Sequence, residues 1–103
     1  MAAREVRGVR LGFVDYDLNN YHARVFLQLF RGELAGLGTR VECAWGMQEE
    51  SSRRWAAEQG LRWLDGPAAV AAAVDAVVIL APSHAETHPQ LAREVFPAGK
   101  PVF

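Results

Sequence analysis

The sequence predicts a three-layer α/β/α fold with a mostly parallel five-stranded sheet, in one domain that spans residues 1–103. Two observations predict it. Apolar stretches of strand length alternate with stretches of helical periodicity, which is typical of parallel strands joined by right-handed crossovers. The stretch Ala76–Ala81 is a continuous apolar run, as in a strand that is covered on both faces.

The first two elements show the two periodicities most clearly. A strand is expected at Val9–Asp15, with Gly12 inside it at a place where another group comes close. A helix is expected from Asn20 to about Leu37, with Asn19 or Asn20 as its N-cap. Its apolar residues recur at helical spacing and are expected to face the core: Tyr21, Val25, Phe26, Leu29, Phe30, Leu34 and Leu37.

The rest of the chain continues the alternation. The second helix is expected to turn its polar residues, Ser52 among them, to solvent. The remaining elements are a strand over Thr39–Trp45, a helix over Glu49–Gln59, a short strand at Leu61–Leu64, a small Ala-rich helix opened by Asp65-Gly66-Pro67, a strand at Ala76–Ala81, a helix from about His88 or Pro89 to Phe96, and a strand that begins at Lys100–Phe103.

Composition and charge exclude several classes of partner. The formal net charge of −1 argues against a surface that binds nucleic acid and against a basic face for membranes. No apolar run approaches the roughly 18 residues of a membrane span, and the first residues lack the apolar core of a signal peptide. A cytoplasmic protein is therefore expected. Cys43, the only cysteine, lies in an apolar strand pattern and is expected to be a small buried hydrophobe.

Two segments are expected to form the ligand-binding edge. Ligands of parallel sheets bind outside the carboxyl ends of the strands, where the strand order reverses. The first strand leads there into Asp15–Asn20, and the fourth strand leads into Ala81–His88.

The end of the chain carries a resemblance to a known family. The segments Ala81-Pro-Ser-His-Ala-Glu-Thr-His88 and Ala98-Gly-Lys-Pro-Val-Phe103, together with Val9–Val14 and Asp75–Leu80, resemble the nucleotide-binding N-terminal half of one oxidoreductase family. This is the glucose–fructose oxidoreductase, inositol dehydrogenase and rhizopine-catabolism (Gfo/Idh/MocA) family. His88 falls on the family's histidine, with about two extra residues between Pro82 and His88.

The resemblance implies a Rossmann-like domain that binds NAD or NADP. It also implies hydride transfer on sugars, polyols or related hydroxylated compounds. A C-terminal substrate domain, through which the protein would form a homo-oligomer, is absent from this chain. The residues implied to contact the dinucleotide or to line its site are Asp15, Tyr16, Asp17, Leu18, Asn19, Asn20, Trp45, Ala81, Pro82, Ser83, His84 and His88.

The first departure from the family pattern is the missing G-x-G-x-x-G loop. Its three glycines fall approximately on Asp15, Asp17 and Asn20. Asn tolerates left-handed backbone geometry, so Asn20 can replace a glycine conformationally. A carboxylate within about 5 Å of a phosphate would cost roughly 3 kcal/mol at an effective dielectric near 20, against about 1 kcal/mol that a helix N-terminus offers an anion. A diphosphate in the usual pose is therefore disfavoured, unless both side chains point away or a cation intervenes.

Two further departures concern the ribose and the reaction. The acidic residue that usually holds the adenosine ribose falls here on Trp45 or Gly46, although Trp45 could stack on an adenine or cap the core. The sequence ends before the Glu-Lys-Pro whose lysine belongs to the family's catalytic site. Lys100 does not occupy that position and receives no catalytic role.

The histidines near this edge leave alternatives open. His84 and His88 are either at the mouth of the site or ligand-free residues of a loop and a helix start. A metal site built from Asp15, Asp17, His84 and His88 is conceivable, but no element carries a pair at ligand spacing, so no metal is expected. His22 has equal claims to face the site or solvent.

Two other function classes compete with the oxidoreductase domain. The first is a receiver-like signalling domain, because Asp15 and Asp17 resemble the acidic patch that holds Mg²⁺ after the first strand of receivers. A receiver also needs a phosphorylatable aspartate at the end of its third strand, and the best matching strand ends in Ile79-Leu-Ala-Pro82. The second is a non-catalytic regulatory domain that has lost its ligand.

Overall fold

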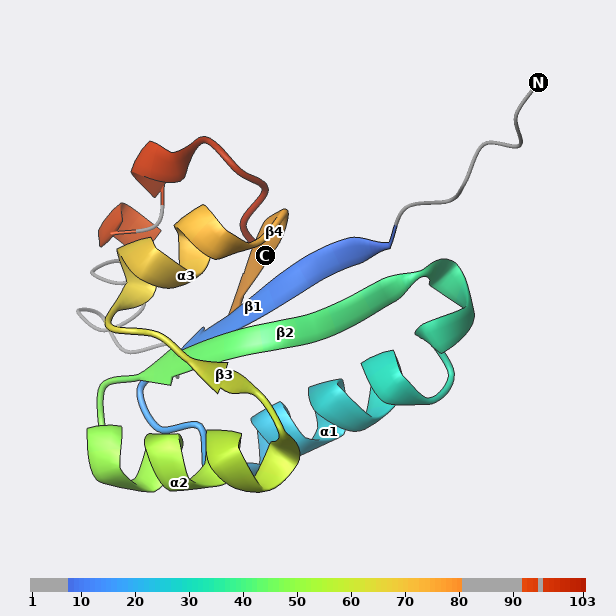
Figure 1. The fold of residues 1–103 in the computed structure, drawn as a ribbon, viewed down its shortest axis with the longest axis horizontal. Helices are drawn as coiled ribbons and strands as arrows, with labels where there is room; N and C mark the ends of the chain where they lie inside the picture. Colours follow the sequence, from blue (N-terminus) through green and yellow to red (C-terminus); the bar gives the residue numbers. More distant parts are fainter. Residues whose placement is uncertain (1–7, 81–91, 95) are drawn as a thin grey trace.

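The computed structural model describes residues 8–80, 92–94 and 96–103, which form a three-layer α/β/α fold (Figure 1). Helices α1 and α2 cover one face of the sheet, and α3 lies on the other face, where it contacts η2. The elements are β1 (Val9–Asp15), α1 (Tyr21–Arg31), η1 (Ala35–Leu37), β2 (Thr39–Gly46), α2 (Glu49–Gln59), β3 (Arg62–Trp63), α3 (Pro67–Ala73), β4 (Ala76–Ile79) and η2 (Phe96–Ala98).

The sheet has four parallel strands in the order β3-β2-β1-β4. The first strand therefore lies between the second and the fourth, and the order reverses between β1 and β4. The expected fifth strand is instead a single bridge between Val77 and Val102. Pro101 accepts a hydrogen bond from the Val77 N–H at 2.9 Å, but it has no N–H of its own with which to lengthen the ladder.

Helix α1 ends earlier than its periodicity predicts, at Arg31 instead of about Leu37. Gly32 closes it by donating its N–H to the Gln28 carbonyl at 2.8 Å. A separate turn of 3₁₀ helix, η1, follows and ends at Gly38, whose φ of 80° is in the left-handed region that favours glycine.

The orientation of α1 also differs from the expected one. Tyr21 was expected in the core, but 73% of its surface is exposed. Ala23 and Leu27 face the sheet instead, and Phe30 packs beside them against the same cluster. Because residues two positions apart lie on nearly opposite sides of an α-helix, the burial of Ala23 turns the ring of Tyr21 outward.

Two glycines allow helices to approach the sheet closely. A Cβ atom on Gly12 would lie 2.3 Å from Cγ1 of Val70, so α3 packs directly on the backbone of β1. This confirms the close approach expected at Gly12. A Cβ atom on Gly46 would lie 2.1 Å from Oγ of Ser52, so α2 comes equally close to the end of β2. Ser52 is fully buried, and the expectation that it faces solvent was wrong.

Apolar side chains fill both faces of the sheet. Cys43 belongs to the cluster under α3, which confirms it as a buried hydrophobe. The cluster under α3 contains Val14, Cys43, Val70, Ala71, Val74, Val77, Ile79 and Ala92. The cluster under α1 and α2 contains Phe13, Leu18, Ala23, Leu27, Ala44, Trp55, Ala56, Leu61 and Val78.

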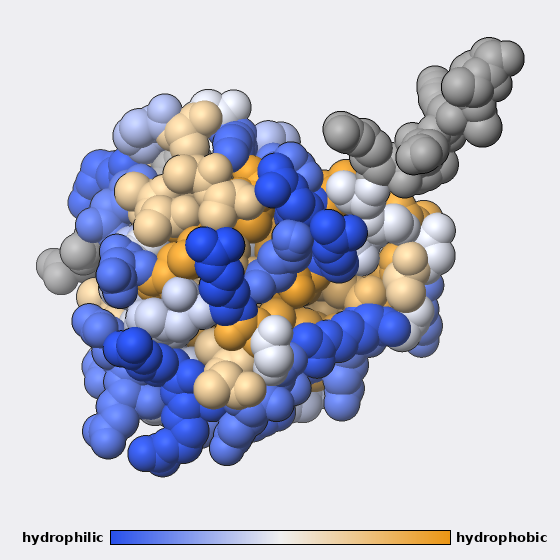
Figure 2. Space-filling model, in the orientation of Figure 1, coloured by the Kyte–Doolittle hydropathy of each residue, from blue (hydrophilic) through white to orange (hydrophobic). Residues whose placement is uncertain are grey.

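The outer surfaces of α1 and α2 are mainly hydrophilic, as the blue residues along the lower part of Figure 2 show. Within the described residues, none of the helices combines the length and the apolar character that a bilayer crossing requires.

Candidate functional site

The candidate site lies at the carboxyl edge of the sheet, where β1 leads into α1. Asp15, the last residue of β1, is fully shielded from solvent (0% exposed). Its Oδ1 accepts the backbone N–H of Tyr16 at 2.6 Å, and its Oδ2 accepts the side-chain amide of Asn20 at 2.6 Å. The carboxylate is therefore held within the loop.

Burial raises the pKa of Asp15 above its ordinary value, because desolvation disfavours the ionised form. The hydrogen bond from Asn20 and those from the backbone of Tyr16 and Asp17 act in the opposite direction and stabilise the carboxylate. The nearby charge of Asp17 adds a further, smaller increase to the pKa. The Asp15 carboxyl group is therefore shielded from water, and its oxygens accept hydrogen bonds from the loop instead.

Asp17 and Ser52 hold the middle of the loop. Oδ1 of Asp17 accepts the N–H of Asn19 at 3.0 Å, and the Ser52 hydroxyl donates to the same oxygen at 3.5 Å. The Ser52 oxygen in turn accepts the N–H of Leu18 at 2.9 Å. A buried hydroxyl on α2 thus fixes a loop that precedes α1, and Gly46 makes room for it.

Asn20 is the N-cap of α1, which decides between the two candidates, Asn19 and Asn20, that the sequence had left open. Its Oδ1 accepts the N–H of Ala23 at 2.8 Å, which satisfies one of the free donors of the first turn. Its amide group donates to the carboxylate of Asp15 and to the carbonyl of Asp17. The Asn20 side chain therefore ties the start of α1 to the loop after β1.

Five backbone N–H groups of this stretch donate to acceptors within the chain. They belong to Tyr16, Leu18, Asn19, Asn20 and Ala23. Glycine-rich loops offer such donors to a phosphate. In this chain these five donors are already used.

A cavity of about 260 Å³ adjoins the loop. The exposed ring of His22 lies at its rim and meets the ring of Tyr21 edge to face, with 5.9 Å between the ring centroids. The cavity is lined by Asp15, Tyr16, Asp17, Asn19, Asn20, His22 and Leu80. The structure thus brings together five of the predicted loop residues, whereas Leu18 is fully buried below them.

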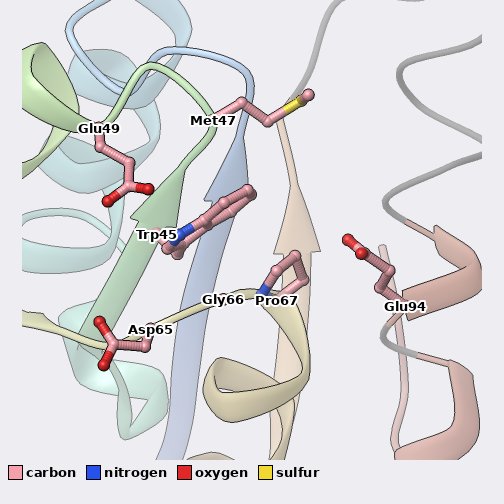
Figure 3. Close-up of a pocket in the computed structure, with 7 residues that line it drawn as sticks. All are labelled: Trp45, Met47, Glu49, Asp65, Gly66, Pro67 and Glu94. Atoms are coloured by element: carbon pink, nitrogen blue, oxygen red, sulfur yellow. The ribbon is translucent and has the colours of Figure 1, made fainter.

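A second cavity, of about 460 Å³, opens at the ends of β2 and β3 (Figure 3). The Trp45 ring and Met47 form its apolar wall, and Gly66 and Pro67 close it at the start of α3. Trp45 also packs on the core cluster under α3, which confirms its role in capping the core, whereas stacking on an adenine stays a prediction. We call this space the Trp45 cavity.

Three carboxylates surround the Trp45 cavity. Glu49 comes from the first turn of α2, Asp65 from the turn before α3, and Glu94 from the helical residues 92–94. Among the described residues that line it, none is a lysine or an arginine. Asp65 and Glu94 lie far from Trp45 in the sequence, and only the fold brings them to it, so sequence reasoning missed both.

Backbone hydrogen bonds join the two cavities. The N–H of Met47 donates to the Asp15 carbonyl at 3.1 Å, and the N–H of Gln48 donates to the Tyr16 carbonyl at 2.8 Å. The side-chain amide of Gln48 also donates to the hydroxyl of Tyr16 at 2.7 Å. The loops after β1 and β2 therefore support each other.

The remaining predicted site residues lie outside the described part of the chain. These are Ala81, Pro82, Ser83, His84 and His88. Among the residues that the structure describes, no group of three or more potential metal ligands lies together.

The chain is similar in structure to several solved dehydrogenases and NAD-binding proteins. UDP-N-acetylglucosamine 3-dehydrogenase from Acidithiobacillus ferrooxidans matches with a TM-score of 0.71 and 23% identity, over 93% of this chain and 28% of that one. Biliverdin reductase from Synechocystis sp. PCC 6803, solved with biliverdin and NADP⁺, matches with a TM-score of 0.69 and 26% identity, over 91% of this chain and 28% of that one. An NAD-binding protein from Listeria innocua matches with a TM-score of 0.69 and 28% identity, over 93% of this chain and 26% of that one.

No protein-family model and no curated protein matches the sequence. The chain spans about a quarter of the length of the solved structures that it resembles. These likenesses support the resemblance to the Gfo/Idh/MocA oxidoreductases at the level of the fold, and the domain is a Rossmann-like α/β domain of the kind that such dehydrogenases contain.

Proposed function

We propose that this chain is the nucleotide-binding half of a longer NAD(P)-dependent oxidoreductase that acts on sugars, polyols or related hydroxylated compounds by hydride transfer. The observation that carries the proposal is the Trp45 cavity. It lies at the carboxyl edge of a β3-β2-β1-β4 sheet, where folds of this kind bind the adenosine end of a dinucleotide. By the same family resemblance, a C-terminal domain would supply the substrate site and the contacts of a homo-oligomer.

The walls of the Trp45 cavity suit an adenosine. Its volume of about 460 Å³ falls in the range of small-ligand sites, and the Trp45 ring offers a flat apolar face for a base. The carboxylates of Glu49 and Asp65 are acceptors for ribose hydroxyl groups, although neither stands at the end of β2 itself. The loop after β1 does not suit the diphosphate, because its own side chains occupy its donors.

The charge of the Trp45 cavity favours NAD over NADP. The 2′-phosphate that distinguishes NADP is normally accommodated by an arginine. Here the described residues that line the cavity include three carboxylates and no basic side chain. We expect NAD to bind at least about tenfold more tightly than NADP, which corresponds to roughly 1.4 kcal/mol.

Calorimetry with the full-length protein tests this function. NAD is expected to bind, and Trp45→Ala is expected to weaken the binding by about tenfold or more. Trp63→Ala is the matched control, because Trp63 packs against the cluster under α1 and α2, on the opposite face of the sheet. The proposal fails if neither NAD nor NADP binds at millimolar concentration, or if both variants lose affinity equally.

The strand order argues against the receiver-like alternative. In flavodoxin-like folds, which include receivers, the order is 2-1-3-4-5, so the first strand lies beside the third. In this chain β1 lies beside β4, and β3 is at the far edge. With acetyl phosphate as donor, we expect no phosphorylated chain by mass spectrometry; a stable phosphoprotein would reverse this assignment.

A non-catalytic regulatory domain remains the second candidate, and the closed loop after β1 favours it. A Rossmann-like domain whose phosphate donors are taken by Asp15 and Asp17 has lost a main reason to bind a dinucleotide. Calorimetry separates the candidates, since a regulatory domain of this kind would bind neither NAD nor NADP.

A further inference from the structure

We propose that Asp15 and Asp17 act as a built-in substitute for a ligand's diphosphate, so that any dinucleotide binds here without help from the start of α1. The carboxylate of Asp15 accepts the N–H of Tyr16, and the carboxylate of Asp17 accepts the N–H of Asn19. This proposal rests on the proposed function in one respect only, namely that the ligand whose diphosphate is kept away from the start of α1 is a dinucleotide.

The position of Asp17 blocks the usual approach of a diphosphate. The second glycine of the dinucleotide motif lets the backbone come close to the diphosphate, and Asp17 stands at this position. Its carboxylate is held over the loop by the Asn19 N–H at 3.0 Å and the Ser52 hydroxyl at 3.5 Å. An arriving phosphate would meet a negative charge that is bonded in place.

The position of Asp15 makes this arrangement hard to rearrange. Asp15 is fully buried, and its partner Asn20 is also the N-cap of α1. Freeing the Tyr16 N–H for a ligand would leave a buried carboxylate without one of its donors and would strain the cap. Only the N–H groups of Tyr21 and His22 lack an acceptor at the start of α1, among the residues that the structure describes.

Inorganic pyrophosphate tests the proposal directly on the wild-type chain. We expect no saturable change in the ¹H–¹⁵N signals of residues 16–23 when sodium pyrophosphate is added, with sodium chloride of equal ionic strength as the reference. A saturable change at any of these amides, Tyr21 and His22 included, overturns the proposal. This measurement does not depend on whether the chain binds a nucleotide elsewhere.

Two variants show whether the carboxylates are the cause. In Asp15→Gly/Asp17→Gly we expect the same amides to respond to pyrophosphate, because donors are freed and two negative charges are removed. The milder Asp17→Gly keeps the buried contact between Asp15 and Asn20, and its freed Asn19 amide is expected to respond. Glu33→Gln/Glu58→Gln, on exposed helical and turn positions, makes the same change in net charge as the double variant and is expected to give no response. A folded Asp17→Gly chain whose amides ignore pyrophosphate would contradict the proposal.

Adenosine and ADP separate this proposal from the proposed function. If the start of α1 takes no part, the two ligands bind with dissociation constants within about threefold of each other. A gain of about tenfold or more for ADP overturns the proposal and leaves the oxidoreductase function standing. If the full-length protein binds no nucleotide, the oxidoreductase function fails, while the pyrophosphate result still decides the role of the two carboxylates.

Discussion

Asp15 is a buried acidic residue, and its burial determines how its contribution to stability changes with pH. Burial raises the pKa of the folded carboxyl group above the ordinary value of 3.8. The folded chain then holds a proton at pH values where the unfolded chain has lost it. Stability that depends on Asp15 is therefore greatest at low pH and declines as the pH rises above about 4.

The variant Asp15→Asn tests this sign. We expect the unfolding free energy of the wild type, measured relative to Asp15→Asn, to fall as the pH rises above about 4, by at most about 1.4 kcal/mol per pH unit. Urea unfolding of both chains at a series of pH values measures the difference. A difference that stays constant or grows with pH would show that the hydrogen bonds of Asp15 outweigh its desolvation.

At the scale of elements, Arg10 and Asp75 clamp β1 to the start of β4. The carboxylate of Asp75 accepts the N–H of Arg10 at 2.9 Å and two guanidinium bonds at 3.2 Å. The hydrogen bonds from the Arg10 side chain, and then those from its backbone, lower the pKa of Asp75 to about 2. This contact therefore stabilises the fold above about pH 4 and is lost as the pH falls toward 2, opposite in sign to Asp15.

We expect Asp75→Asn to unfold more easily than the wild type at neutral pH and to lose most of this difference as the pH falls to about 2. Thermal unfolding followed by circular dichroism between pH 2 and pH 7 measures it. Glu33→Gln makes the same change in net charge at an exposed position away from the clamp. Identical pH profiles for wild type and Asp75→Asn would contradict the prediction.

The close packing of α2 on β2 requires that residue 46 has no side chain, as is the case for Gly46. Gly46→Ala would place a Cβ atom 2.1 Å from the Ser52 oxygen and 2.7 Å from the Ser52 Cβ, both buried. We expect a loss of about 1–3 kcal/mol of unfolding free energy, because the helix must move away. Gly36→Ala, which meets nothing within 4 Å, is expected to be neutral or stabilising by up to about 1 kcal/mol. Urea denaturation compares them, and equal losses would show that the Gly46 contact relaxes freely.

At the scale of the whole molecule, Cys43 reports on global unfolding. It lies in the core cluster under α3, and burial raises the pKa of its thiol to about 11. Few native chains hold the reactive thiolate at pH 8, and reagents cannot reach it. We expect labelling by a disulfide reagent to follow the unfolding curve in urea; rapid labelling without denaturant would mean that the α3 side opens locally.

The sequence predicted the alternation of elements because apolar periodicity records which face each element buries. It also predicted an N-cap at Asn19 or Asn20 and the close approach at Gly12, because each has a local cause. The exposure of Tyr21 and the burial of Ser52 could not be predicted in the same way. The burial of Ser52 depends on how closely α2 meets the sheet at Gly46, and the exposure of Tyr21 depends on which face of α1 packs on the sheet.

The candidate site was likewise only partly predictable from the sequence. The loop Asp15–Asn20 could be placed at the sheet edge from strand order alone, and its missing glycines were visible. The sequence did not reveal that the two aspartates bond to the loop's own amides, since this depends on backbone geometry. Asp65 precedes α3 and Glu94 follows β4, so only the fold brings these two carboxylates to Trp45.

The hydrogen bonds that join the loops after β1 and β2 make them one cooperative unit. Ser52 and Gln48, both contributed by the second crossover, bind Leu18 and Tyr16 in the first. Opening either loop breaks bonds of both, so their amides should exchange with solvent at a shared rate. A ligand that binds against Trp45 would then reduce the motion of the loop after β1, with which it makes no contact.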